Sequence, residues 1–191
     1  MDKKERIIKS AIDLFQEQGI EKTTISHIVK RAQIAQGTFY LYFSSKLALM
    51  PAIAEVMVEV LVKQIEVNIE GEKEFQNQMK KLVEAIFAVN EEYSEILALI
   101  YSGLASTEHL KEWETVYAPC YELVSKLIEE AKKDGIINIS GSSERTAKLV
   151  IGLVESAAEQ VYLYNYSDNT EIEDQKEAVT NFLFDALQLK R

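Results

Sequence analysis

The scarcity of residues that break secondary structure is the feature that most constrains this chain. Its 191 residues include only seven glycines and two prolines, Pro51 and Pro119. Sheet proteins need frequent turns, and turns draw on glycine and proline, so this scarcity favours long helices over strands. The hydrophobic residues, 47% of the chain, recur at helical spacing in successive segments. The sequence therefore predicts an all-α protein of about nine helices.

Several classes of protein are excluded by simpler features. A lone cysteine, Cys120, rules out an internal disulfide framework and fits a reducing compartment. The opening residues MDKKERII lack the apolar core of a secretory signal. No uninterrupted apolar run reaches the roughly 18 residues that a membrane-spanning helix needs. We therefore expect a soluble, cytoplasmic protein without a membrane partner.

The first 43 residues predict three short helices in succession. Residues 3–18 form an amphipathic pattern that ends at Gly19, where a left-handed helix cap is expected. Thr23 and Thr24 offer hydroxyl caps to a second helix with an apolar side. A third, aromatic segment over 36–43 follows after about three residues, and the four-residue spacing of Phe39 and Phe43 puts both on the face expected to pack on the first two helices. This length and order match a helix-turn-helix.

The rest of the chain predicts longer helices. One runs from Ser44 or Ser45 to about Asn68, and Pro51 either kinks it or sets its start. Pro119 is expected to kink a later helix. We therefore divide the chain into a three-helix head, residues 1–46, and a helical bundle, residues 47–191. The helices expected in the bundle after the first cover about 73–90, 92–103, 107–134, 143–165 and 171–189.

The charge distribution supports this division. The net charge is −10, which by itself argues against a nucleic-acid partner. Residues 1–46, however, contain eight Lys or Arg residues against five Asp or Glu residues, whereas the remainder contains 13 against 26. A modestly basic head on an acidic body suggests that the head meets an anion.

The head resembles the DNA-binding domain of the TetR family of bacterial repressors over residues 7–49, about a quarter of the chain. The resemblance lies in the segments IIKSAIDLFQEQGIEKTT and ISHIVKRAQIAQGTFYLYFSSKLAL. It implies a helix-turn-helix with a Gly-Thr-aromatic-Tyr recognition segment and a Phe-x-Ser-Lys sequence opening the fourth helix. The matching positions are Phe15, Gly19, Thr23, Thr24, Ile28, Ala32, Gly37, Thr38, Phe39, Tyr40, Phe43, Ser45 and Lys46.

The recognition segment departs from the family pattern at two places. Gln33 stands where the family often has a turn glycine, and Ala35-Gln36 stands where it often has Ser-Lys. The amide of Gln36 can pair with adenine, and Leu41 can contact a thymine methyl group or nothing. The resemblance makes Lys46 a phosphate contact. The residues expected to bind DNA are Thr24, Gln36, Gly37, Thr38, Tyr40, Leu41, Tyr42 and Lys46.

Aromatic residues are the candidate effector site of the body. Trp113, Tyr117 and Tyr121 follow at intervals of one helical turn and so share a face. The resemblance implies a small, often hydrophobic effector bound between the helices, although plain core packing is the better explanation for any single one of these rings. Glu155 and Glu159 can meet a cationic effector, remain solvated or lie at a dimer rim. The expected effector residues are Phe87, Tyr101, Trp113, Tyr117 and Tyr121.

The last two predicted helices carry apolar residues on more than one side. Residues 150–154 are apolar or glycine throughout. In the last helix, Phe184 is expected to point away from an inward stripe formed by Ala178, Val179, Phe182, Leu183, Ala186 and Leu187. A helix that is apolar on two sides needs a second partner, so we expect a homodimer. Its expected interface comprises Val150, Gly152, Val154, Ala157, Phe184 and Ala186.

These features favour a transcriptional regulator over an enzyme. The sequence has no HExxH, CxxC or GxSxG motif and no glycine-rich phosphate loop, and it suggests neither a metal nor a cofactor. We expect a repressor that binds a pseudo-palindromic operator in double-stranded DNA and leaves it when a small effector binds. The alternative is a helix-turn-helix DNA-binding structural protein without an inducer. The operator and the effector are not specified by the sequence.

Overall fold

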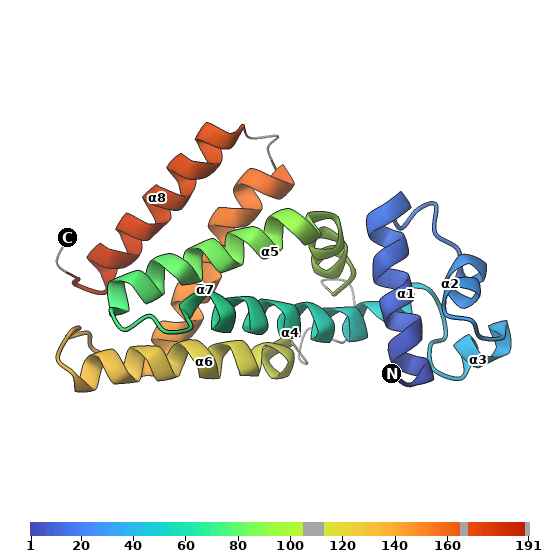
Figure 1. The fold of residues 1–191 in the computed structure, drawn as a ribbon, viewed down its shortest axis with the longest axis horizontal. Helices are drawn as coiled ribbons and strands as arrows, with labels where there is room; N and C mark the ends of the chain where they lie inside the picture. Colours follow the sequence, from blue (N-terminus) through green and yellow to red (C-terminus); the bar gives the residue numbers. More distant parts are fainter. Residues whose placement is uncertain (105–112, 165–167, 190–191) are drawn as a thin grey trace. The chain divides into compact units, whose positions relative to one another are not determined.

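The computed structural model describes residues 1–104, 113–164 and 168–189, with side chains at 1–100, 114–164 and 168–189. These residues form eight α-helices and no strand, which confirms the predicted all-α fold (Figure 1). A 3₁₀ turn, Leu47–Leu49, precedes α4, and a π-helical turn, Gln160–Tyr164, extends α7. The helices are α1 (Lys3–Gln18), α2 (Ile25–Arg31), α3 (Gln36–Tyr40), α4 (Met50–Ile69), α5 (Phe75–Leu104), α6 (Trp113–Lys133), α7 (Ser143–Glu159) and α8 (Asn169–Ala186).

Local capping sets the ends of the first helix. The Asp2 carboxylate accepts a hydrogen bond from the Glu5 backbone N–H, and the Glu5 carboxylate accepts one from that of Asp2, both at 2.8 Å. This reciprocal pair satisfies backbone donors that the helix leaves unpaired. The helix ends at Gly19, whose φ of 78° lies in the left-handed region that favours glycine.

The structure differs from the predicted helix count at one place. A break between helices over 73–90 and 92–103 was expected, and α5 is kinked there at a non-helical residue, Tyr93 (φ −118°, ψ 20°), so that the two expected helices are counted as one. The described part of the chain therefore has eight helices rather than about nine. The ambiguity at Pro51 is also resolved: α4 begins at Met50. Pro51 lies in the first turn, where its missing N–H is not needed.

The described residues group into two compact units. One comprises residues from 1–57 and 95–113, and the other comprises residues from 58–94 and 114–191. Helices α4 and α5 each contribute to both units. Neither unit is therefore one continuous stretch of chain.

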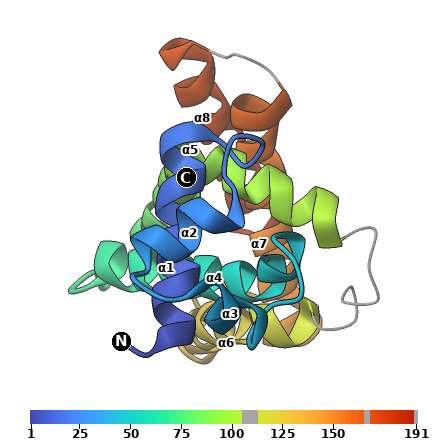
Figure 2. The same ribbon diagram turned by 90° about the vertical axis from the view of Figure 1, so that its right-hand side faces the viewer.

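The head of the first unit is a small helical cluster. Helix α1 packs on α2, and α2 packs on α3. Figure 2 shows α2 and α3 in front of α1. Phe15, Ile28 and Phe39 lie in its interior with at most 1% of their surfaces exposed. This apolar centre holds the short helices α2 and α3, which are too short to be stable alone.

The second unit has its own core between α5, α6, α7 and α8. Helix α7 packs on α8, and α6 is continuous through Pro119. Val150, Val154 and Ala157 of α7 were expected at a dimer interface, but each lies in the core of the subunit with at most 6% exposure. The most enclosed side chains of this unit include Met79, Leu82, Ile86, Phe87, Val124 and Ile128.

The expected orientation of α8 is wrong at its two phenylalanines, whereas Val179 and Leu183 of the expected inward stripe are buried. Phe184 was expected to point outward and Phe182 inward, yet Phe184 is 6% exposed and Phe182 is 63% exposed. The reason is the position of α5, because Phe184 faces that helix and the Lys80 ammonium lies 5.8 Å from its ring centre. Of the six residues expected at a dimer interface, only Gly152 and Ala186 lie on the surface.

Candidate nucleic-acid interface and effector site

The recognition segment has one buried and one exposed face. Phe39 and Phe43, four residues apart, are 0% and 6% exposed, and their ring centres lie 5.8 Å apart. These rings anchor the segment, so the residues between and opposite them face outward. Thr38 is half-buried. The residues expected to bind DNA that are exposed in this segment are Gln36, Gly37, Tyr40, Leu41 and Tyr42.

Gly37 is not required by the fold. Its φ lies outside the left-handed region, and a Cβ atom built on it would meet nothing within 4 Å. A glycine inside a helix lowers stability by about 0.5–1 kcal/mol relative to alanine. The packing of the protein therefore gives no reason for glycine here. Because Gly37 has no side chain, the outer face of α3 is slim and can come close to another molecular surface.

The paired threonines before α2 have different roles. Thr23 is fully buried, and its hydroxyl donates to the Gly19 carbonyl oxygen at 2.8 Å. Thr24 is exposed and caps α2, because its hydroxyl oxygen accepts from the His27 backbone N–H at 3.2 Å. The His27 Nδ1 atom accepts in turn from the Thr24 backbone N–H at 3.4 Å. Of the pair, only Thr24 presents its side chain at the surface.

Lys46 is held inside the head by its ammonium group. The Nζ atom donates to the carbonyl oxygens of Ile20 and Thr23, at 2.6 and 2.7 Å. These bonds tie the segment after the recognition helix to the loop between α1 and α2. An ammonium has three N–H groups, so one remains for a phosphate. Sequence reasoning missed this tie because 26 residues separate Lys46 from Ile20.

The turn between α2 and α3 is supported by a second long-range contact. Gln33 has a φ of 53°, in the left-handed region that side chains other than glycine disfavour. The Arg6 guanidinium donates to the carbonyl oxygens of Ala32 and Gln33. Gln33 therefore stands where the family often has a turn glycine, and its backbone conformation is one that favours glycine. No sequence pattern pointed to Arg6.

Arg31, which precedes this turn, forms an ion pair with Glu17 of α1. The two terminal nitrogens of Arg31 donate to the two carboxylate oxygens of Glu17, at 2.8 and 2.6 Å. This pair, mainly through its hydrogen bonds, lowers the pKa of Glu17. The positive charges left at the surface of α2 and the loop before it include Lys22 and Lys30, which are exposed.

In the body, the structure brings together two of the five expected effector residues. The ring centres of Tyr117 and Tyr121 lie 5.6 Å apart on α6. Phe87 is buried and packs edge-on against Tyr162, at 6.2 Å between ring centres. The side chains of Tyr101 and Trp113 lie outside those that the structure describes.

The carboxyl group of Glu155, a half-buried residue, adjoins the tyrosine pair. The Tyr117 hydroxyl, on a side chain only 4% exposed, donates to Glu155 Oε1 at 2.6 Å. Enclosure of the carboxyl raises the pKa of Glu155 to about 7, the Tyr117 hydrogen bond opposes this rise, and the charge of Glu159 adds to it. Of the alternatives left open for Glu155, full solvation is therefore excluded. The contact joins α6 to α7.

Two further buried polar groups lie in the same unit. Burial raises the pKa of the Cys120 thiol to about 12, so the thiol stays protonated and unreactive at neutral pH. The Asn90 side chain donates to the Ile86 carbonyl oxygen at 2.9 Å, whereas its own oxygen has no partner among the described residues. Neither group was singled out from the sequence as a functional residue.

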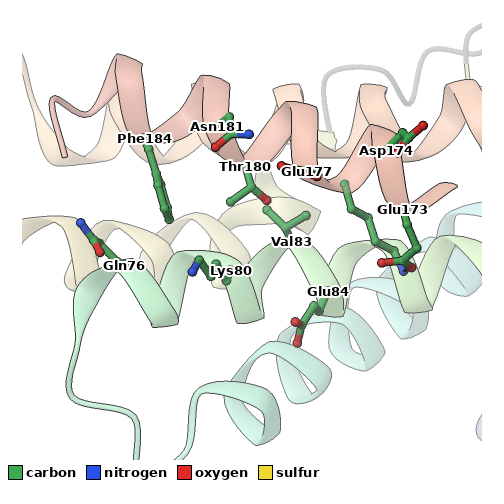
Figure 3. Close-up of a pocket in the computed structure, with 11 residues that line it drawn as sticks. Gln76, Lys80, Val83, Glu84, Glu173, Asp174, Glu177, Thr180, Asn181 and Phe184 are labelled. Atoms are coloured by element: carbon green, nitrogen blue, oxygen red, sulfur yellow. Dashed lines mark hydrogen bonds and ion pairs between the residues drawn. The ribbon is translucent and has the colours of Figure 1, made fainter. Parts of the chain in front are cut away.

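A groove of about 780 Å³ lies between α5 and α8 (Figure 3). Val83 and Phe184 give it an apolar floor, and Figure 3 shows Phe184 pointing from α8 toward α5. Its rim carries four carboxylates, of Glu84, Glu173, Asp174 and Glu177, and the ammonium groups of Lys80 and Lys176. Of the expected effector residues, the three whose side chains the structure describes, Phe87, Tyr117 and Tyr121, do not line it.

Two negative findings apply to the described residues. No group of three or more His, Cys, Asp or Glu side chains among them is placed to hold a metal ion. None of their helices combines the length and the apolar character that crossing a membrane requires.

Comparison with known proteins relates both halves of the chain to one family. Residues 7–53 match the family described as bacterial regulatory proteins, tetR family. Residues 79–187, more than half of the chain, match the tetracyclin repressor-like C-terminal domain. The chain is also similar to the HTH-type transcriptional regulator YvdT of Bacillus subtilis (strain 168), with 39% identity over 181 residues that cover 95% of this chain and 93% of that protein.

Solved structures share the fold. A TetR-family transcriptional regulator from Pectobacterium atrosepticum superposes with a TM-score of 0.82 at 17% identity, covering 98% of this chain and 95% of that one. Thermus thermophilus FadR, a TetR family repressor in complex with lauroyl-CoA, gives a TM-score of 0.76 at 18% identity, covering 98% and 96%. With matches to the family at both ends and 39% identity to YvdT, the chain belongs to the TetR family of helix-turn-helix transcriptional regulators, which are not enzymes.

Proposed function

We propose that this regulator is a cytoplasmic, homodimeric repressor that leaves its operator when a small hydrophobic effector binds. Residues 1–46 make the contacts to double-stranded DNA, and residues 47–191 hold the effector site and the dimer interface. The observation that carries the proposal is the outer face of α3, which combines a glycine that the fold does not need with exposed polar and aromatic side chains.

The outer face of α3 suits a major groove. A recognition helix must come close to the base edges, and Gly37 removes the side chain that would hold it off. Tyr40 and Tyr42, 50% and 46% exposed, present hydroxyl groups that can reach phosphates or bases. Thr24 and the remaining N–H of Lys46 supply phosphate contacts beside the groove.

Substitution of Gly37 tests DNA binding separately from folding. Gly37→Ala is expected to raise the thermal midpoint slightly, because alanine is the better helix former. Gly37→Leu is expected to abolish specific binding while the circular dichroism spectrum stays that of the wild type. Fluorescence anisotropy against duplexes selected by the wild-type protein gives the affinity. Full affinity in Gly37→Leu would show that α3 does not enter the groove.

The proposed dimer interface is the exposed face of α7 and α8. Leu149 is 74% exposed and Phe182 is 63% exposed, the largest apolar exposures on these two helices. Gly152 is exposed, and a Cβ atom there would meet nothing within 4 Å, so the subunit itself does not explain this glycine either. Small residues permit close helix approach across a two-fold axis. Ala178 and Ala186 complete this face on α8.

A dimer is also what specific binding needs. One head offers only a handful of contacts, too few to select a single site in a genome. Two heads related by a two-fold axis read a pseudo-palindrome whose half-sites lie about 34–36 Å apart, or a multiple of that distance.

The effector site is proposed at the junction of α6 and α7. Tyr117 and Tyr121 provide aromatic surface there, and Phe87 is the third described member of the set. The Tyr117–Glu155 hydrogen bond fixes α6 against α7, so a ligand that competes for either group alters the packing of both helices. Tyr101 and Trp113 are proposed as further residues of the effector site.

Lauroyl-CoA is the first probe for the effector, because Thermus thermophilus FadR binds it in its solved structure. We expect it to weaken operator binding, and operator DNA to weaken lauroyl-CoA binding by the same factor, as thermodynamic linkage requires. Coenzyme A without the acyl chain is the control. Equal ligand affinity with and without DNA would exclude lauroyl-CoA as the effector that releases the operator.

A further inference from the structure

The recognition surface, defined as Gln36, Gly37, Thr38, Tyr40, Leu41 and Tyr42, carries no charge. The uncharged stretch is longer than this surface, since residues 33–45 include no Lys, Arg, Asp or Glu. The commonest specific contact to a guanine is a bidentate one from Arg or Lys to its N7 and O6 atoms. No side chain of this surface can make it.

The cations that flank the stretch are engaged elsewhere in the head. Arg31 is bound through two nitrogens to the Glu17 carboxylate. The Lys46 ammonium is bound to the carbonyl oxygens of Ile20 and Thr23. A bidentate contact to guanine from either residue requires these bonds to break. The surface that faces the groove is therefore left with amide, hydroxyl and apolar groups.

Two of these groups match an A·T pair. The exposed Gln36 amide forms no hydrogen bond among the described residues, so its N–H and its oxygen are free to pair with adenine N7 and N6. Leu41 is 82% exposed, more than any other large apolar side chain among the described residues. The only apolar group that a base pair presents in the major groove is the C5-methyl group of thymine. Leu41 lies one turn from Gly37, where the helix is slim enough to approach it.

We propose that each operator half-site is read through A·T pairs, with adenine bound by Gln36 and a thymine methyl group bound by Leu41. No guanine is required at the contacted positions. This inference rests on the proposed DNA-binding function and names the base pairs that the same surface recognises.

Selection of sites from a random pool of 40-base-pair duplexes by the full-length protein is the first test. We expect an enriched half-site with A·T pairs at two contacted positions. A required guanine at those positions would overturn the inference and leave the DNA-binding function intact. A pool that shows no enrichment would overturn the proposed function, and the inference with it.

Single-atom changes in the selected duplex then test each contact with the wild-type protein. Uracil in place of the contacted thymine removes only the methyl group and is expected to weaken binding about fourfold per half-site, as for one buried methyl group. Substitution of 7-deazaadenine for the contacted adenine removes N7 and is expected to weaken binding at least fivefold. Unchanged affinity for either duplex would overturn the corresponding contact.

Protein variants connect each change to its side chain. In Leu41→Ala the uracil duplex is expected to bind as well as the thymine duplex. Leu47→Ala is the matched control, because Leu47 is a 64% exposed leucine outside the recognition surface, and it should keep the fourfold difference. Gln36→Arg is expected to shift the selected base from adenine to guanine. A fourfold difference that persists in Leu41→Ala would show that another side chain reads the methyl group.

Discussion

Replacing Glu155 with glutamine is expected to leave the free energy of unfolding almost unchanged at pH 4.5 and to raise it by about 3 kcal/mol at pH 8. The carboxyl is enclosed beside Tyr117, and this enclosure raises its pKa from an ordinary 4.5 to about 7. Each unit of pKa difference between the folded and unfolded states corresponds to about 1.4 kcal/mol. Glutamine keeps the shape and still accepts the Tyr117 hydrogen bond, but it never ionises.

The direction of the pH dependence follows from the number of protons that the folded and unfolded states bind. Below pH 4.5 the carboxyl is protonated in both states and contributes no pH dependence. Between pH 4.5 and 7 the unfolded chain loses this proton while the folded chain of the wild type keeps it, so the free energy of unfolding falls as the pH rises. Above pH 7 both states are ionised and the loss is complete. The stability difference between Glu155→Gln and the wild type therefore grows across this window and then levels off.

Urea denaturation followed by circular dichroism at 222 nm, at half-unit steps from pH 4.5 to 8.5, measures this difference. The protein concentration must be fixed because the proposed dimer would make the stability depend on it. Glu122→Gln is the matched control, since it removes an exposed carboxylate from the same helix as Tyr117 and should shift stability by only a few tenths of a kcal/mol. A pH-independent difference for Glu155→Gln, or a variant less stable than the wild type at pH 8, would refute the argument.

Three further substitutions test the head and the interface. Gln33→Gly is expected to raise the free energy of unfolding by about 1 kcal/mol, because the backbone at this residue is left-handed, and a lower value from urea denaturation would contradict this. Lys46→Met should destabilise the head by about 1–2 kcal/mol, because two hydrogen bonds are lost. It should also reduce the slope of log affinity for DNA against log salt concentration by about 0.9. An unchanged slope in a salt titration would show that Lys46 does not contact DNA. Phe182→Asp should give folded monomers in sedimentation, whereas Phe184→Asp should unfold the subunit because it buries a carboxylate, and a stable dimer of Phe182→Asp would place the interface elsewhere.

Local signals in the sequence predicted most of the helix boundaries and the recognition segment. Gly19 ends α1 and Thr24 begins α2 because caps act on the nearest turn of backbone. Phe39 and Phe43 were placed inward by their four-residue spacing alone. The exposed face of α3 followed from the same spacing.

The features that sequence did not predict depend on neighbours far along the chain. Arg6 and Lys46 satisfy carbonyl groups 26 residues away, and no periodicity encodes such a contact. Phe182 and Phe184 of α8 were assigned to the wrong sides because both flank the buried stripe that contains Leu183, and only the position of α5 decides which is covered. The state of Glu155 is likewise set by the enclosure that a second helix provides.

The sharing of α4 and α5 between the two compact units bears on how such a regulator can be recombined. A crossover that joins residues 1–46 to the body of another regulator separates the head from residues 47–57 and 95–104, which belong to the same unit. A functional chimera must therefore exchange two stretches of the gene together, or keep compatible residues in both. We expect single-junction hybrids of TetR-family proteins to work best between close relatives, where the second stretch already matches the first.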